Sequence, residues 1–135
     1  MLTIIDTSVA VKWFVTGDEP GRSEALAVLE NLCAEPNRYI VPELFFNEML
    51  AVFCRLLRDA SKIKEYMHIL EQLGIERVGN GAQLLDKAAE IAKEYNISGY
   101  DAIFAATASL LKGVWLTADK AAAKKLKNTD FVKLL

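Results

Sequence analysis

Residues 98–119, SGYDAIFAATASLLKGVWLTAD, decide the expected fold of this chain. The first part, 98–111, is apolar almost all round, which is typical of a helix buried on every side. The run VWLT at 114–117 then has the length and composition of a buried strand. A helix that leads into a strand in this way is the repeating unit of an α/β protein.

The same alternation extends on both sides of this stretch. The other strand candidates are 2–5, 38–41, 75–78 and 131–135, and the other helix candidates are 20–34, 42–57, 61–73, 82–95 and 119–127. Because strands alternate with helices, the pattern predicts a parallel sheet with helices on both faces. The continuous apolar runs also favour a sheet that is buried on both sides.

The composition indicates one globular domain, residues 1–135, with 53% hydrophobic and 25% charged residues. A net charge of −2 does not indicate wholesale electrostatic capture of nucleic acid. No apolar run approaches the roughly 20 residues of a membrane span, and the N-terminus lacks the features of a signal peptide. We therefore expect a cytoplasmic protein, with Cys33 and Cys54 as buried thiols rather than a disulfide or a zinc site.

Four carboxylates are spaced so that the fold is expected to bring them to one edge of the sheet. Asp6 directly follows the first strand candidate, and Asp119 follows the fourth. Asp101 lies in the first turn of the buried helix, and Glu48 lies in the second turn of a helix that leaves a strand end. In open α/β sheets, ligands bind beyond the carboxyl ends of the strands.

Glu48 is the most unusual of these acids. The residues three and four positions away on its helix, which has Pro42 in its opening turn, are all apolar: Leu44, Phe45, Ala51 and Val52. An unpaired charge on such a face is costly, and it is usually accommodated by a basic partner, a metal ion or a shifted pKa. We expect a metal ion beside Glu48. The alternative to a metal ion is a basic partner such as Arg55 or Lys12.

The other three acids have a structural alternative, which is helix capping. Asp6 can cap a helix after the first strand, and Asp119 lies where a helix N-terminus favours an acid. Asp101 completes an S-x-x-D sequence with Ser98, which has the form of a capping box. The sequence leaves the capping role and the ligand role open for each of these residues.

Several acids at one edge repel one another unless a cation is present. Hard oxygen ligands favour Mg²⁺ or Mn²⁺ over zinc or copper, and such a site suits hydrolysis of phosphodiester bonds. The only histidine, His68, has polar helical neighbours and is expected to face solvent, which leaves little for a Ser-His or Cys-His mechanism. No glycine-rich phosphate-binding motif is present.

These residues carry a resemblance to a known family. The segments IDTSVAVKWF (5–14), ELFFNEMLAVF (43–53), YDAIFAATA (100–108) and LTAD (116–119) occur in the order found in that family. The chain resembles the PIN-domain family and, within it, the VapC-type toxins of prokaryotic toxin–antitoxin pairs.

The resemblance implies a three-layer α/β/α fold with a mainly parallel sheet of about five strands. It also implies an endoribonuclease that depends on Mg²⁺ or Mn²⁺, a homodimer, and an antitoxin partner that inhibits the active site. The implied metal-binding acids are Asp6, Glu48, Asp101 and Asp119, supported by Thr117 and Ser8. Some relatives carry a further acid close behind the fourth one; here Asp130 is the nearest and lies too far along. This departure favours a single protein-held metal ion.

Candidates for contacts with RNA phosphates are Lys12, Arg55, Arg58 and the cluster Lys120, Lys124, Lys125 and Lys127. For the lysine cluster we favour a solvated helix face, and for Trp13 and Phe14 we favour packing over base stacking. Three alternatives to a toxin stay open: an RNA-processing PIN nuclease without an antitoxin, a non-catalytic scaffold, and a receiver-like regulatory module. A receiver usually needs a second acid beside the first strand, where this chain has Thr7 and Ser8.

Overall fold

The computed structural model describes all 135 residues and contains one sheet of five parallel strands. The strands are β1 (Thr3–Ile5), β2 (Tyr39–Pro42), β3 (Glu76–Val78), β4 (Val114–Thr117) and β5 (Val132–Leu134). Their spatial order is β3-β2-β1-β4-β5, and every neighbouring pair is parallel. The sheet that the sequence predicts is therefore confirmed.

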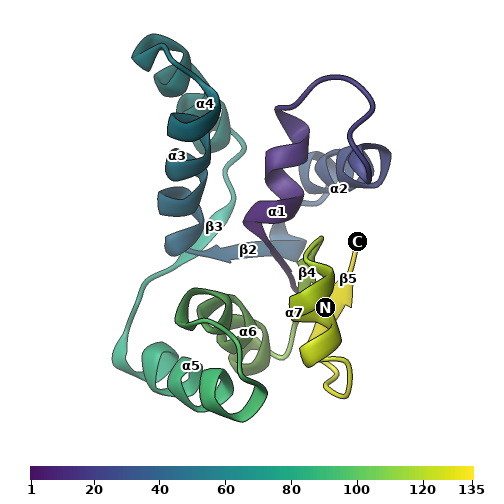
Figure 1. Cartoon of the computed structure of the whole chain (residues 1–135), viewed down its shortest axis with the longest axis vertical. Coiled ribbons are helices and arrows are strands. Elements are labelled where there is room, and N and C mark those ends of the chain that lie inside the picture. Colours follow the sequence, from purple (N-terminus) through teal and green to yellow (C-terminus); the bar gives the residue numbers. More distant parts are fainter.

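Seven α-helices connect the strands. They are α1 (Thr7–Ala10), α2 (Arg22–Ala34), α3 (Leu44–Leu56), α4 (Ala60–Gln72), α5 (Ala82–Tyr95), α6 (Gly99–Leu111) and α7 (Lys120–Lys125). Short 3₁₀ helices follow α1 and α2 at Val11–Trp13 and Pro36–Arg38. Figure 1 shows α1 to α4 on one side of the sheet and α5 and α6 on the other, which is the three-layer α/β/α arrangement.

The core lies on both faces of the three central strands. Ile4, Val41 and Trp115 are fully buried on β1, β2 and β4, whereas the edge strands β3 and β5 keep exposed residues. The helix α6 is buried at every position from Ala102 to Ala108, because it lies between the sheet and α5. The Phe104 ring stacks on Trp115 with ring centroids 6.1 Å apart.

Two aromatic residues near the N-terminus serve packing, as expected. Trp13 is buried, and its indole N–H donates a hydrogen bond to the Ala25 carbonyl at 2.8 Å. The Phe14 ring packs against Phe53 and Tyr66, with centroids 4.9 and 5.0 Å away. These contacts hold α1 and the segment after it against α2 and the α3–α4 pair.

The start of α3 differs from the prediction. Pro42 is the last residue of β2, where it pairs with Val78, and the helix begins only at Leu44. The following N–H, that of Glu43, donates to the Val78 carbonyl at 2.8 Å. Pro42 therefore extends the strand because the sheet register continues to this position, whereas its sequence context alone also suits a helix start.

The expectation of two buried thiols is wrong. Cys33 and Cys54 are both free and exposed. Each follows a fully or nearly fully buried residue, Leu32 or Phe53, on its helix. One step along a helix turns the side chain by about 100°, which carries both thiols from the inward face to the outward one.

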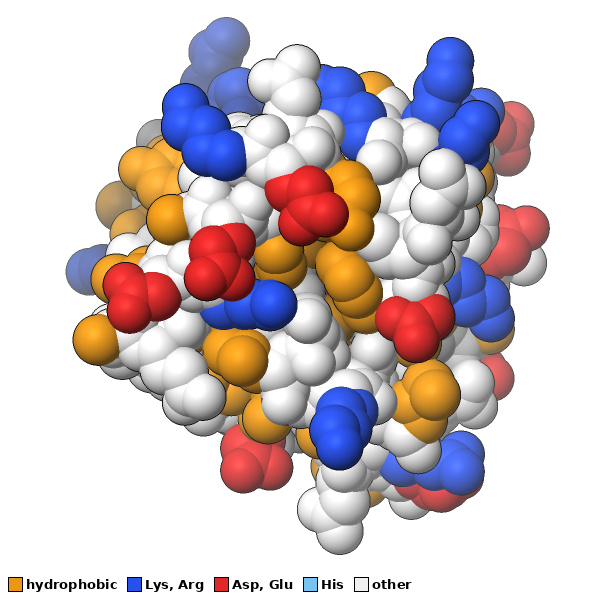
Figure 2. Space-filling view, turned by 90° about the horizontal axis from the view of Figure 1, so that it is seen from below, with side chains coloured by type: hydrophobic (Ala, Val, Ile, Leu, Met, Phe, Trp, Pro, Cys, Tyr) orange, Lys and Arg blue, Asp and Glu red, His pale blue; other side chains and the backbone are white.

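No helix in the structure combines the length and apolar character that a membrane span requires. Figure 2 views the molecule from below, over the layer that holds α5 and α6. Acidic, basic and hydrophobic side chains are intermixed over the face that it shows.

Candidate active site

Asp6 lies at the carboxyl end of β1, where it also caps α1. Its side chain accepts a hydrogen bond from the Ser8 N–H at 3.2 Å. The indole N–H of Trp115 donates to Oδ1 at 3.1 Å, and the Thr117 hydroxyl donates to Oδ2 at 3.1 Å. A further hydrogen bond comes from the Ser8 hydroxyl to Oδ2. Asp6 is 7% exposed, so these donors take the place of water around the carboxylate.

Ser8 and Thr117 connect the end of β1 to the turn after β4. The Ser8 Oγ accepts the N–H of Ala118 at 2.9 Å, and the Thr117 Oγ1 accepts the N–H of Asp119 at 3.0 Å. Their two hydroxyl oxygens lie 3.3 Å apart. The resemblance implies that Ser8 and Thr117 support the metal-binding acids, and in the structure both contact Asp6.

Glu48 lies in the second turn of α3 and is half-buried. The Thr7 hydroxyl donates to its Oε1 at 2.8 Å. It forms no ion pair with Arg55 or Lys12. The Lys12 ammonium instead contacts the Pro20 carbonyl at 2.7 Å and the Glu19 carboxylate at 3.4 Å. The basic-partner alternative for Glu48 is therefore wrong.

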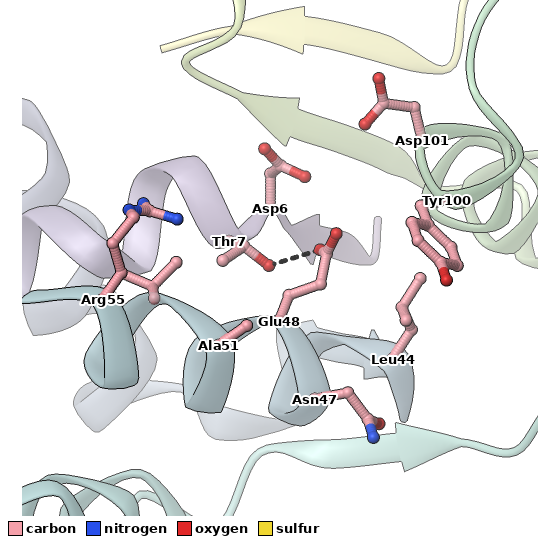
Figure 3. Close-up of a pocket in the computed structure, with 10 residues that line it drawn as sticks. Asp6, Thr7, Leu44, Asn47, Glu48, Ala51, Arg55, Tyr100 and Asp101 are labelled. Carbon is pink, nitrogen blue, oxygen red and sulfur yellow. Dashed lines mark hydrogen bonds between the residues drawn. The ribbon is translucent and has the colours of Figure 1, made fainter.

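Three of the four apolar neighbours of Glu48 line a cleft, whereas Phe45 is fully buried in the core. Leu44 and Val52 are only partly buried and Ala51 is exposed. Together with Glu48 they line a cavity of about 430 Å³, whose other lining residues are Asp6, Thr7, Asn47, Arg55, Tyr100 and Asp101. Figure 3 shows that carboxylates from β1, α3 and α6 converge on this cleft, with Arg55 at one end and Tyr100 at the other.

Asp101 reaches the cleft from the first turn of α6. Its backbone N–H donates to the Ser98 hydroxyl at 3.0 Å, so Ser98 provides the helix cap. The carboxylate of Asp101 takes no part in that cap and extends toward Asp6 in Figure 3.

Asp119 has a different position from the other three acids. It is exposed, it caps α7, and its Oδ1 accepts the N–H groups of Ala121 at 2.9 Å and Ala122 at 3.2 Å. It lies outside the residues that line the cleft. The capping role is therefore present in the structure for Asp119, and its charge still acts on Asp101.

The electrostatics of the cleft link the four acids. Burial raises the pKa of Asp6 despite hydrogen bonds from Ser8, Thr117 and Trp115. Burial also raises the pKa of Glu48, and the charges of Asp6 and Asp101 raise it further. The pKa of Asp101 is raised by burial and then by the charges of Asp6 and Asp119. The carboxylates of Asp6, Glu48 and Asp101 are therefore held in settings that disfavour their own negative charge.

The donor chemistry of the cleft suits a hard divalent cation. All of its acidic groups are carboxylates, no ion pair neutralises any of them, and His68 lies exposed on α4. As the side chains stand, no three His, Cys, Asp or Glu groups lie close enough to bind one ion together. Mg²⁺ usually binds only one or two protein carboxylates and retains several waters, so a site without three convergent carboxylates still fits such an ion.

Two of the hydrogen bonds in this site come from residues to which the sequence reasoning gave no role. Trp115 donates to Asp6, and Thr7 donates to Glu48. A signal for Trp115 was present, because side chains two residues apart on a strand share a face. Trp115 therefore faces the same way as Thr117. Thr7 had no comparable signal, since its contact with Glu48 depends on how α1 and α3 pack.

Several solved structures have the same fold as this chain. A toxin–antitoxin complex from Klebsiella pneumoniae has a TM-score of 0.71 and 20% identity, covering 97% of this chain and 95% of that one. FitAcB from Neisseria gonorrhoeae has a TM-score of 0.73 and 19% identity, covering 99% of this chain and 96% of that one. VapBC2 from Rickettsia felis, bound to a DNA fragment from its promoter, has a TM-score of 0.74 and 15% identity, covering 100% of this chain and 98% of that one.

No curated protein sequence matches the chain significantly. A family model does: the model described as PIN domain matches residues 3–128. That range includes all five strands except β5, together with the four acids and the hydroxyl groups around Asp6. The chain belongs to the PIN-domain family.

Proposed function

We propose that this chain is an endoribonuclease that depends on Mg²⁺ or Mn²⁺ and acts in the cytoplasm as the VapC-type toxin of a toxin–antitoxin pair. The observation that carries the proposal is the convergence of Asp6, Glu48 and Asp101 on one cleft at the carboxyl edge of a parallel sheet. The pKa of each of these acids is raised. A PIN domain generally acts as a nuclease that uses divalent cations, which accounts for that arrangement.

In this proposal the cation is held by Asp6, Glu48, Asp101 and Asp119, directly or through water. A bound cation would supply Lewis-acid chemistry, that is, polarisation of a phosphoryl oxygen and activation of a water molecule. The protein supplies the orientation of the ligands. Ser8, Thr117 and Trp115 hold the carboxylate of Asp6, and Thr7 holds that of Glu48.

Arg55 is the one basic side chain that lines the cleft, and it forms no ion pair. A guanidinium placed there suits contact with an RNA phosphate, since its planar group of N–H donors matches phosphate geometry. Tyr100 lies at the opposite end of the cleft and is 66% exposed. Its ring is available for stacking on an unpaired base of single-stranded RNA.

The antitoxin and the homodimer are also part of the proposal. The similar structures named above are described as a toxin–antitoxin complex, FitAcB and VapBC2. On this chain, the outward sides of α3 and α4 carry large exposed hydrophobic side chains: Leu50, Leu56 and Ile69. Such side chains suit burial against a second protein chain. Sedimentation analysis of the purified chain, alone and with the product of an adjacent gene, tests both partners.

The test of the nuclease is cleavage of a mixed cellular RNA pool by purified protein, with Mn²⁺ or with EDTA. We expect cleavage that requires the cation and disappears in Asp6→Asn. The control is Asp18→Asn, which makes the same change at an exposed position outside the cleft and should leave cleavage unchanged. Cleavage that persists in Asp6→Asn, or that needs no cation, would contradict the proposed mechanism.

A further inference from the structure

The positive charge of this acidic chain is concentrated near its C-terminus. Residues 120–133 contain five of the 16 basic side chains and one of the 18 acidic ones. Their net charge is therefore +4, whereas the rest of the chain carries −6. An asymmetry of this size on a chain with a net charge of only −2 indicates a local surface for an anionic partner.

Three of these lysines share one face of α7 and the turn after it. Lys120, Lys124 and Lys127 follow one another at intervals of four and three residues, which is the spacing of one helix face. All three are exposed, and none forms an ion pair. Their charges are therefore not neutralised within the protein.

These lysines form one wall of a groove. The groove has a volume of about 360 Å³ and lies between α7 and the edge strand β5, which pack against each other (Figure 1). It is lined by Lys120, Ala123, Lys124, Lys127, Val132 and Leu134. Half of these residues are lysines, the others are apolar, and none is acidic. A solvated helix face explains the exposure of the lysines, but it does not explain a hollow without any acidic side chain.

Two residues of the α7 segment, Asp119 and Lys125, connect the groove electrostatically to the acids of the cleft. Asp119, whose charge acts on Asp101, is the cap of α7 and directly precedes Lys120. On the other flank of α7, the Lys125 ammonium donates to the Asn96 carbonyl at 2.9 Å, and its charge lowers the pKa of Asp101. The two ends of α7 thus carry charges that act on Asp101, and the groove lies along the side of this helix.

We propose that the groove between α7 and β5 binds the phosphate backbone of single-stranded RNA that flanks the scissile bond. This proposal rests on the proposed function for its choice of ligand. Lys120 and Lys124 lie about 6 Å apart along the axis of α7, at 1.5 Å per residue, and Lys127 follows in the turn after the helix. Each of the three can neutralise one phosphate of a strand leaving the cleft. The apolar floor of Ala123, Val132 and Leu134 allows the strand to approach without competition from acidic groups.

The test measures RNA binding without cleavage. A fluorescein-labelled single-stranded RNA is titrated in EDTA with the wild-type chain and with the triple variant Lys120→Gln, Lys124→Gln, Lys127→Gln. Glutamine has nearly the same helix propensity as lysine, so α7 is retained. Each lost phosphate contact on a single strand lowers the slope of log affinity against log salt by about 0.7. We expect the slope to fall by about 2, so the wild type loses about 20-fold more affinity than the variant between about 50 and 200 mM salt.

A second triple variant is the matched control. Lys64→Gln, Lys93→Gln and Lys112→Gln remove the same charge from exposed lysines that form no ion pair and lie outside the groove. This control should keep the slope of the wild type. Arginine at the three groove positions should also keep it, because the positive charge is retained.

Four results would overturn the proposed role of the groove. They are no binding of RNA by the wild type, an equal fall of the salt slope in both glutamine variants, an unchanged salt slope in the groove variant, and a fall of the salt slope with arginine at the groove positions. A polyglutamate peptide is also titrated. If the peptide binds the wild type but not the groove variant, while both bind RNA equally well, the groove belongs to an acidic protein segment and the proposal is overturned. Binding and cleavage separate the two hypotheses. If RNA binding depends on the groove lysines but Mn²⁺ gives no cleavage, the proposed nuclease fails alone; if the chain cleaves RNA with an unchanged slope, the groove fails alone.

Discussion

Asp6 is the most constrained side chain of the cleft. Both of its oxygens accept hydrogen bonds, from the indole of Trp115 on one side and from Ser8 and Thr117 on the other. Burial still outweighs these donors and raises its pKa. A carboxylate held in this way has one orientation and a strong requirement for a nearby positive charge.

Trp115→Phe is expected to weaken both the fold and the binding of a cation. The phenyl ring retains most of the packing on Phe104 but leaves Asp6 Oδ1 without its donor, and losing a hydrogen bond to a charged group costs about 1.5–3 kcal/mol. Urea unfolding measures the stability, and calorimetry with Mn²⁺ measures the affinity. Trp13→Phe is the control, because that indole donates to the Ala25 carbonyl and makes no contact with Asp6. Equal effects of both variants on Mn²⁺ affinity would refute a positioning role for Trp115.

Glu48→Gln tests whether the glutamate binds the cation. A ligand of the native state adds about 2.7 kcal/mol of stability at 100 times its dissociation constant. We expect the melting temperature of the wild type to rise with Mg²⁺ or Mn²⁺ and most of this rise to be absent in Glu48→Gln. The Thr7 hydroxyl can still donate to the amide oxygen, so the local hydrogen bond is preserved. A full cation-induced shift in the variant would remove Glu48 from the proposed ligands.

At the scale of the secondary-structure elements, the first turns of α6 and α7 give their acids different roles. Ser98 caps α6, which leaves the Asp101 carboxylate free for the cleft. Asp119 caps α7 itself and lies at the exposed end of that helix. The capping alternative that the sequence left open therefore holds for the contacts of Asp119 and not for the carboxylate of Asp101.

Substitutions of Asp119 separate capping from a role in catalysis. Asparagine is as good a helix cap as aspartate, whereas alanine at this position costs about 1 kcal/mol. We expect Asp119→Asn to keep the unfolding free energy and Asp119→Ala to lower it, with RNA cleavage reduced in both. Urea unfolding and the cleavage assay are measured on the same preparations. Full cleavage by Asp119→Asn would show that the residue acts only as a cap.

At the scale of the whole molecule, the strand order β3-β2-β1-β4-β5 explains how distant acids meet. The strands β1, β2 and β4 are adjacent and parallel, so the segments that leave them start at one edge of the sheet. Those segments carry Asp6, Glu48 and Asp119. The helix α6 precedes β4 and begins at the same edge, which adds Asp101.

The burial of Glu48, together with the charges of Asp6 and Asp101, predicts how stability depends on pH. The pKa of Glu48 is raised above its ordinary value of 4.5 in the folded state, so the native protein holds this proton more tightly than the unfolded chain. The tighter binding of this proton stabilises the native state at pH values below the ordinary pKa, and this stabilisation is lost as the pH rises through the raised pKa. In EDTA, Glu48→Gln should therefore unfold at a higher temperature than the wild type at neutral pH, with the difference vanishing below pH 4.5.

Melting curves across this pH range check the prediction. Glu43→Gln is the control, because Glu43 lies exposed at the start of α3, outside the cleft. The amide oxygen of glutamine can still accept the hydrogen bond from the Asn80 N–H. A stabilisation by Glu48→Gln that is the same at all pH values would show that the charge of Glu48 does not destabilise the fold. Saturating Mg²⁺ should reverse the ranking at neutral pH, because the cation stabilises the wild type.

The sequence by itself determined the elements and the candidate acids. Strand length and helix periodicity are properties of neighbouring residues, so they can be recognised locally. The features found in this way are the apolar runs of β1, β2 and β4, the buried pattern of α6, and the positions of Asp6 and Asp119 after strands. The parallel arrangement followed from their alternation. The exposure of Cys33 and Cys54 was missed, since two apolar thiols give no local signal of which helix face they occupy.

The tertiary structure decided what surrounds each acid. Only the packing of α1 against α3 brings Thr7 to Glu48, only the pairing of β1 with β4 brings Trp115 to Asp6, and only the packing of α7 on β5 gives the C-terminal lysines a groove. It also turned Lys12 toward Pro20, away from the cleft. The physical reason is that side-chain contacts, burial and pKa depend on distances between segments far apart in the chain, which periodicity along the sequence does not encode.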